Sequence, residues 1–128
     1  MANENVLLVE DDADIRELLS YTLKREGYVV EECDSAESAR SVLRRRTLPD
    51  LILLDTNMPG MNGHQMLEHL RADPVLKHTP VIMLTARCEP QDIAAASARG
   101  ISDYVTKPFD FAQLMDKIHA VLKDQKDA

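Results

Sequence analysis

Three short apolar runs, each closed by a polar residue, constrain the fold of this chain more than any other feature. The runs occupy residues 6–9, 51–54 and 81–84, and they are closed by Glu10, Asp55 and Thr85. Consecutive apolar residues without alternation are typical of a strand that is covered on both faces. Between these runs, apolar residues recur at helical spacing instead. Buried strands that alternate with helices predict an α/β domain with a parallel sheet.

The remaining periodicities complete a pattern of five strands and five helices. Two weaker apolar segments, residues 28–30 and 104–105, predict the second and fifth strands. Helices are expected around residues 15–23, 35–46, 66–70, 91–99 and 111–122. Right-handed crossovers then give a doubly wound sheet. Because 128 residues suffice for one buried core, we expect a single domain over residues 1–128.

Composition and charge exclude several functions. The net charge is −7, which disfavours direct binding to nucleic acid, because such binding needs lysine and arginine to displace counterions. No apolar stretch reaches the length of a membrane span, and the polar N-terminus lacks a signal-peptide pattern. We therefore expect no membrane association and a cytoplasmic location. The two cysteines, Cys33 and Cys88, match no metal motif and are expected to be reduced.

The polar residues that close the strands are expected to share one edge of the sheet. In an open parallel α/β sheet the carboxyl ends of the strands form a common rim, where ligands bind. Glu10, Asp11, Asp55, Thr85 and Lys107 all fall at or just past such an end. A carboxylate cluster beside one hydroxyl and one ammonium suits a divalent metal and a phosphoryl group better than an organic substrate.

Four segments, in this order and with this spacing, resemble the receiver domain of two-component response regulators. They are Leu-Leu-Val-Glu-Asp-Asp at 7–12, Asp-Thr-Asn-Met-Pro-Gly at 55–60, Leu-Thr-Ala at 84–86 and Asp-Tyr-Val-Thr-Lys-Pro at 103–108. Each segment alone is common, whereas the set is specific. The resemblance extends over nearly the whole chain and is to the single-domain, chemotaxis-regulator type. It implies a flavodoxin-like fold with strand order 2-1-3-4-5.

The resemblance implies a phosphorylation switch rather than an enzyme of repeated turnover. Asp55 would accept a phosphoryl group from a phosphohistidine of a histidine kinase or a histidine phosphotransfer protein. Lys107 would bind a phosphoryl oxygen, and Thr85 would donate its hydroxyl to the group. Movement of Thr85 would draw in Tyr104, the switch aromatic. The changed surface would be read by a downstream target protein or by an output domain outside this chain.

The resemblance also implies a Mg²⁺ site. Asp11, Asp55 and the backbone carbonyl of Asn57 would bind the ion directly, and Glu10 would act mostly through water. Each of the crowded carboxylates disfavours ionisation of the others, and a hard cation removes that conflict. Asp12 is the alternative acidic residue, and we expect it to be the N-cap of the first helix instead.

Each of these assignments has a plainer alternative. Asp55 could simply end a strand and cap a turn, Lys107 could be a solvated surface lysine, and Tyr104 could be an ordinary half-buried aromatic. Pro108 argues against a loosely held lysine, because the residue before a proline is conformationally restricted. Arg87 could shield a phosphoryl group from attacking water, or it could point into solvent.

Three other functional classes fit the sequence less well. A phosphatase of the haloacid dehalogenase type needs an aspartate general acid two residues after its nucleophile, where this chain has Asn57. A flavodoxin-like cofactor binder needs a glycine- and hydroxyl-rich loop after the first strand, where residues 10–12 would repel a phosphate. A degenerate receiver used only for interaction usually loses the acidic pair, the acceptor or the lysine, and this chain keeps all of them.

Overall fold

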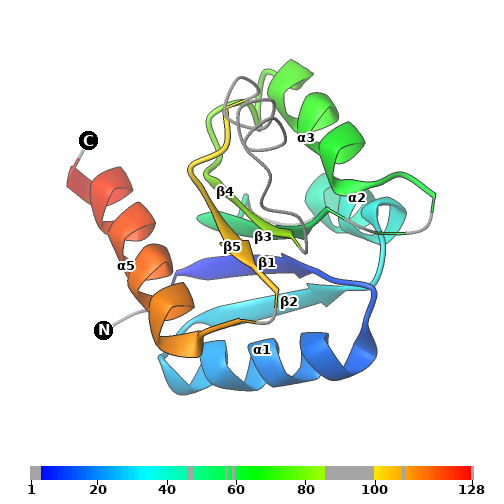
Figure 1. Cartoon of the computed structure of the whole chain (residues 1–128). Coiled ribbons are helices and arrows are strands. Elements are labelled where there is room, and N and C mark those ends of the chain that lie inside the picture. Colours follow the sequence, from blue (N-terminus) through cyan, green and yellow to red (C-terminus); the bar gives the residue numbers. More distant parts are fainter. Residues whose placement is uncertain are drawn as a thin grey trace.

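Five parallel strands form one sheet in the order β2-β1-β3-β4-β5. The strands are β1 (Asn5–Val9), β2 (Val29–Cys33), β3 (Leu51–Asp55), β4 (Val81–Thr85) and β5 (Asp103–Thr106). This computed structural model describes residues 4–45, 48–56, 58, 60–85, 100–107 and 109–127. The doubly wound, parallel α/β fold and its strand order, both expected from the sequence, are confirmed (Figure 1).

In the described part of the chain, helices cover both faces of the sheet (Figure 1). They are α1 (Ala13–Arg25), α2 (Ala36–Arg45), α3 (Gly63–Ala72) and α5 (Phe111–Asp127). Helices α1 and α5 pack against one face of the sheet, and α2 and α3 pack against the other. The helix expected over residues 91–99 lies outside the described residues. Within the described part of the chain, no helix is both long and apolar enough to cross a membrane.

The unbroken apolar runs are explained by this sandwich. Along a strand, successive side chains point to opposite faces. Leu7 and Val9 therefore lie in the core beneath α2 and α3, whereas Val6 and Leu8 lie in the core beneath α1 and α5. Because both faces are covered, both sets must be apolar. Strands β3 and β4 alternate in the same way and are buried at every position.

Two local details differ from the sequence-based prediction. Strand β2 runs to Cys33 rather than ending near Val30, because an edge strand exposes one side and tolerates the polar pair Glu31 and Glu32. On α1, the apolar residue Leu18 is half exposed, at 50%, while Ser20 is buried. The Ser20 hydroxyl donates a hydrogen bond of 3.0 Å to Glu32, which satisfies this buried polar group.

Candidate functional site

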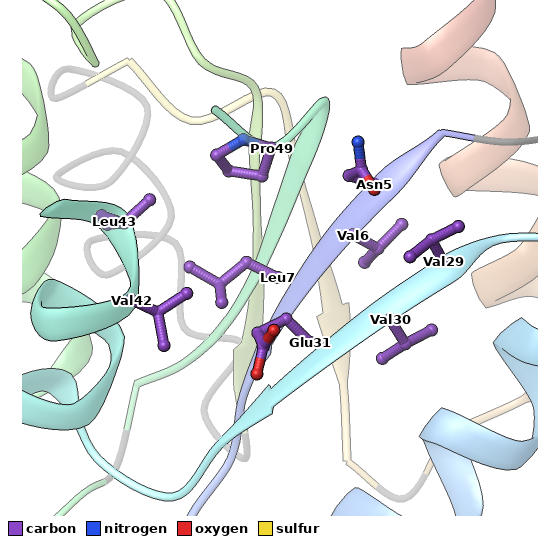
Figure 2. Close-up of a pocket in the computed structure, with 9 residues that line it drawn as sticks. All are labelled: Asn5, Val6, Leu7, Val29, Val30, Glu31, Val42, Leu43 and Pro49. Carbon is purple, nitrogen blue, oxygen red and sulfur yellow. The ribbon is translucent and has the colours of Figure 1, made fainter. Parts of the chain in front are cut away.

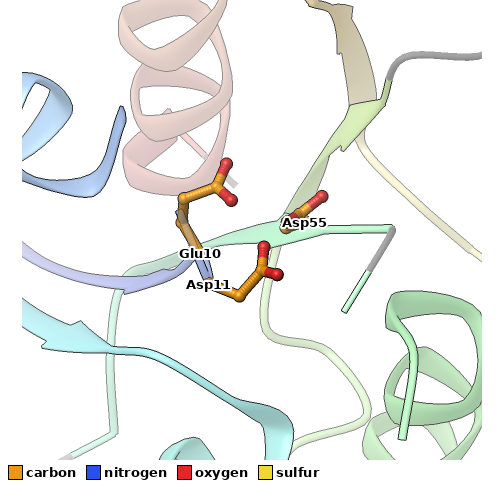
Figure 3. Close-up of side chains that lie close together, drawn as sticks. All are labelled: Glu10, Asp11 and Asp55. Carbon is orange, nitrogen blue, oxygen red and sulfur yellow. The ribbon is translucent and has the colours of Figure 1, made fainter. Parts of the chain in front are cut away.

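Two neighbouring strand ends bring an acidic cluster together at the carboxyl rim of the sheet. Asp55 is the last residue of β3, and Glu10 follows directly after the neighbouring strand β1. One carboxylate oxygen from each of Glu10, Asp11 and Asp55 lies within 4.8 Å of the others. Figure 3 shows Asp11 and Asp55 turned toward a common space, with Glu10 beside them. The parallel register thus joins residues that are 44 or more positions apart in the chain.

Lys107 is the cation that this cluster shares. It follows β5, and its ammonium lies 2.9 Å from Glu10 Oε1 and 3.2 Å from Asp55 Oδ1. The Lys107 backbone N–H also donates to the Thr85 carbonyl at 2.8 Å, which holds the start of the following loop. Burial alone would lower the pKa of Lys107, but the bond to Glu10 and the charge of Asp55 outweigh it and raise the pKa. The ammonium is therefore fixed and charged.

Glu10 is buried completely, at 0% exposure. Besides the Lys107 contact, its Oε2 accepts a hydrogen bond of 3.2 Å from the Asp12 backbone N–H. Arg16 donates to the Glu10 backbone carbonyl at 2.8 Å. A fully buried carboxylate is stable only when it is paired and hydrogen-bonded, and these contacts satisfy that condition. Glu10 therefore holds Lys107 in place beside Asp55.

Asp11 is the exposed member of the cluster, and its surroundings oppose its charge. Partial burial is the main cause that raises the pKa of Asp11, and the hydrogen bond with Asp55 and the negative charge of Asp55 raise it further. A hydrogen bond with Glu10 lowers the pKa but does not outweigh these causes. One ammonium faces three carboxylates, so the cluster carries an excess of negative charge. Three carboxylates at a rim, one of them open to solvent, fit a hard cation that binds oxygen and keeps several waters.

Asp12 takes no part in the cluster. It is the N-cap of α1, and its Oδ1 accepts from the backbone N–H groups of Asp14 at 3.0 Å and Ile15 at 3.1 Å. These bonds satisfy donors that the first helical turn would otherwise leave unpaired. The expectation that Asp12 is structural is confirmed.

Thr85 and Tyr104 lie on neighbouring strands and on the same face of the sheet. Thr85 ends β4 and is buried, and Tyr104 of β5 pairs with Met83 in the parallel register. Met83 and Thr85 are two residues apart, so their side chains point to the same face. Tyr104 is half buried and packs on the core beneath α2 and α3. The two residues expected to form the switch are thus carried by adjacent strands.

Four residues named in the sequence analysis lie outside the described residues: Asn57, Arg87, Cys88 and Pro108. The backbone carbonyl expected from Asn57 as a metal ligand therefore stays a prediction, as does the part assigned to Arg87. What the structure does describe at this rim is the set of Glu10, Asp11, Asp55, Thr85 and Lys107.

Gly63 is a residue that the sequence analysis missed. The helix expected around residues 66–70 begins earlier in the structure: Gly63 is the first residue of α3, and its backbone N–H donates to the Thr56 carbonyl at 3.2 Å. The signal was present, because Asn62 and Gln65 form a capping box in which each side chain accepts from the other's backbone N–H. The capped helix start lies directly against the backbone of Asp55 and Thr56.

Gly63→Ala is expected to disturb the site. An added Cβ would overlap the Asp55 carbonyl oxygen and lie 2.7 Å from Thr56 Cα. Since backbone atoms cannot rotate away, the strand end or the helix must shift, at a cost of about 1–3 kcal/mol in the free energy of unfolding. Urea denaturation measures that cost, and the initial rate of phosphoryl uptake from acetyl phosphate measures the displacement of Asp55.

Gly60→Ala is the matched control for this variant. Gly60 has a φ of 75°, so alanine there is strained, by about 1–2 kcal/mol. Among the described residues, the atoms nearest to its added Cβ belong to the Glu37 side chain, the first of them at 3.5 Å. Gly60→Ala should thus lose stability without displacing Asp55. Equal phosphoryl uptake by the two variants would contradict the steric role of Gly63.

A cavity at the opposite end of the sheet has different chemistry. It measures about 190 Å³ and lies between α2 and the first halves of β1 and β2. Figure 2 shows its lining: Asn5, Val6, Leu7, Val29, Val30, Glu31, Val42, Leu43 and Pro49. With one carboxylate among mostly apolar side chains, this cavity lacks the charged groups of the rim.

Comparison with known sequences places this arrangement among proteins of one kind. A family model described as the response regulator receiver domain matches residues 6–119. The chain is 40% identical over 118 residues to the phosphate regulon transcriptional regulatory protein PhoB of Escherichia coli, covering 92% of this chain and 51% of that protein. It is 34% identical over 122 residues to the chemotaxis protein CheY-3 of Vibrio cholerae, covering 94% and 93% respectively. The chain thus spans about half the length of the PhoB relatives and nearly all of CheY-3.

Solved structures agree with this comparison. The Vibrio cholerae chemotaxis response regulator CheY4 superposes with a TM-score of 0.87 at 31% identity, over 93% of this chain and 98% of that one. The signal receiver domain of a signal transduction histidine kinase from Syntrophus aciditrophicus superposes with a TM-score of 0.88 at 32% identity, over 98% and 94%. Similar domains therefore occur both alone and within longer proteins.

Proposed function

Because this chain belongs to the response regulator receiver domain family of two-component systems, we propose that Asp55 accepts a phosphoryl group from a phosphohistidine. The donor would be a histidine kinase or a histidine phosphotransfer protein. The observation that carries the proposal is the position of Asp55: buried at a strand end, with its Oδ1 3.2 Å from the Lys107 ammonium and two further carboxylates beside it.

The transfer follows from these contacts. A carboxylate oxygen of Asp55 attacks the phosphorus, the P–N bond to the imidazole of the donor histidine breaks, and the imidazole nitrogen keeps the electron pair. The Lys107 ammonium binds an oxygen of the phosphoryl group as it arrives. Glu10, 2.9 Å from the ammonium, keeps Lys107 aimed at the acceptor throughout. The site acts by positioning and charge rather than by proton transfer.

The donor set fits Mg²⁺. Asp11 and Asp55 would bind the ion directly, with the Asn57 carbonyl as a further ligand and Glu10 acting through water. When bound, the ion would neutralise charge on the transferred phosphoryl group. Partial burial, and after it the hydrogen bond and the charge of Asp55, raise the pKa of Asp11. A bound cation would offset the repulsion between the two carboxylates and so would also favour the folded form.

Signalling would pass from Asp55 through Thr85 to Tyr104. A phosphoryl group adds charge and hydrogen-bond acceptors at the rim, and the Thr85 hydroxyl is the neighbouring donor expected from the sequence. Thr85 and Tyr104 share a face of adjacent strands, so a shift of β4 at Thr85 would alter the space for the aromatic ring. The altered surface would be read by a downstream target protein or, if this chain is part of a longer protein, by an attached output domain.

Asp11→Asn is expected to remove the response to Mg²⁺. Binding of an ion to the folded form alone, at ten times its dissociation constant, stabilises that form by about 1.4 kcal/mol. The wild-type protein should gain this stability, and Asp11→Asn, which lacks a direct ligand, should not. Thermal unfolding followed by circular dichroism measures the effect in a chain that has no tryptophan.

Asp12→Asn is the matched control for the metal site. It removes a neighbouring carboxylate, but asparagine preserves the N-cap of α1, so its Mg²⁺ response should equal that of the wild type. If Asp11→Asn gains as much stability from Mg²⁺ as the control does, the assigned metal site is wrong.

A further inference from the structure

The ammonium of Lys117 on α5 makes three contacts at β5, two with Tyr104 and one with Asp103. Its ammonium donates to the Tyr104 backbone carbonyl at 2.9 Å and to Asp103 Oδ1 at 3.1 Å. The same ammonium lies 4.9 Å from the centroid of the Tyr104 ring, within the range of a cation–π interaction. Asp103 Oδ1 in turn accepts from the Tyr104 backbone N–H at 2.8 Å. One cation from a helix thus contacts both the backbone and the ring of the expected switch residue.

The three contacts respond differently to a movement of the ring. The bonds to Asp103 and to the Tyr104 carbonyl tether Lys117 to the strand and do not depend on where the ring lies. The cation–π contact depends on the ring alone, and it is lost when the ring rotates away. Because Lys117 is only 24% exposed, water competes weakly for its ammonium. The contact therefore stabilises one position of the Tyr104 ring relative to others.

We infer that Lys117 is a positioning residue that holds the Tyr104 ring in its resting place and so sets how readily the ring moves when Asp55 is phosphorylated. This inference rests on the proposed function, since it concerns the same switch. Without the ammonium, the fraction of molecules whose Tyr104 ring has left its resting position should rise about two- to fivefold before any phosphoryl group is added. This factor corresponds to the usual strength of a cation–π contact.

The test uses fluorine NMR of protein labelled with 3-fluorotyrosine. The chain has only three tyrosines, Tyr21, Tyr28 and Tyr104, and Tyr104→Phe identifies the Tyr104 signal. Tyr28 is an internal control, because its ring lies 5.9 Å from that of His119, two residues beyond Lys117 on α5. A change at Tyr28 would report displacement of the helix. Spectra are recorded with and without beryllofluoride, a phosphoryl mimic, in the presence of Mg²⁺.

In the wild type, beryllofluoride should shift the Tyr104 signal. In Lys117→Met, which keeps the length of the side chain but not its charge, the mimic-free signal should already lie part of the way along that shift, with Tyr28 unchanged. Lys117→Arg, which can also stack on an aromatic ring, should return the signal to its wild-type position. Asp103→Asn weakens the tether without removing the ammonium, and it should give a smaller displacement in the same direction.

Two results would separate this inference from the function it rests on. In the first, beryllofluoride shifts the Tyr104 signal of the wild type, but Lys117→Met leaves the mimic-free Tyr104 signal unchanged or moves it in the opposite direction. This result would overturn the role of Lys117 and leave the proposed switch intact. If the wild-type Tyr104 signal ignores beryllofluoride, the switch itself is wrong and the inference falls with it. Lys123 is an exposed lysine on the same helix. If Lys123→Met moves the mimic-free Tyr104 signal as far as Lys117→Met does, the effect comes from the loss of any positive charge on α5, and the inference is also overturned.

Discussion

Asp55→Asn is expected to take up no phosphoryl group from acetyl phosphate and Mg²⁺. An amide nitrogen or oxygen cannot replace the carboxylate as nucleophile. No described residue offers a carboxylate in the same place. Glu10 is bound by Lys107 and by a backbone N–H, and Asp11 lies at the exposed side of the cluster. Intact-mass spectrometry measures the adduct directly. The expected change is complete loss, the largest effect of any single substitution in this protein.

The comparison variant for this experiment is Asp12→Asn. It makes the same chemical change one position beyond the acidic pair, and the Asp12 carboxylate serves as the N-cap of α1. Asp12→Asn should therefore be phosphorylated like the wild type. An undiminished adduct on Asp55→Asn would show that another residue is the acceptor, and peptide mapping of that adduct would identify it.

Lys107→Met should cost about 3 kcal/mol of unfolding free energy at neutral pH. The methionine fills a similar volume but leaves Glu10, at 0% exposure, and Asp55, at 1%, without their shared cation. Breaking a buried ion pair costs several kcal/mol because the remaining charge stays buried. We place the cost at the low end of that range since the ammonium is 19% exposed. Urea denaturation of both proteins measures the difference.

The pH dependence of this difference has a definite sign. Lys107 has a raised pKa in the folded protein, so its contribution to stability is complete below the ordinary lysine value of 10.5. It is lost as the pH rises through the higher folded value. The gap between wild type and Lys107→Met should therefore be constant near neutral pH and shrink above pH 10.5. Lys123→Met, at an exposed position, should change stability by less than about 0.5 kcal/mol; a similar small change for Lys107→Met would contradict the buried-pair argument.

Most of the fold could be predicted, and the exceptions have physical causes. The runs at residues 6–9, 51–54 and 81–84 have one interpretation because a strand covered on both faces must be apolar throughout. Strand β2 was placed too short because an edge strand lacks that requirement. The start of α3 was missed because the glycine that begins it looks like loop, and its capping partners, Asn62 and Gln65, become visible only as a pair.

The candidate site was predicted as a set of residues rather than as a mechanism. Asp12 was correctly separated from its acidic neighbours, because N-cap preference is a local property of the chain. Lys117 could not have been found, because nothing in its surroundings along the helix indicates an aromatic ring across the sheet edge.

The sequence by itself determined that the runs at residues 6–9, 51–54 and 81–84 are buried and which polar groups stand at their ends, because both follow from the pattern of a few neighbouring residues. Only the tertiary structure decided which of those groups form ion pairs with one another. Lys107 and Asp55 are 52 residues apart, and their contact depends on strand order and register rather than on local pattern. The same holds for the pairing of Lys107 with Glu10 and of Lys117 with Tyr104, since electrostatic energies depend on distances and burial that arise only when separate strands and helices pack together.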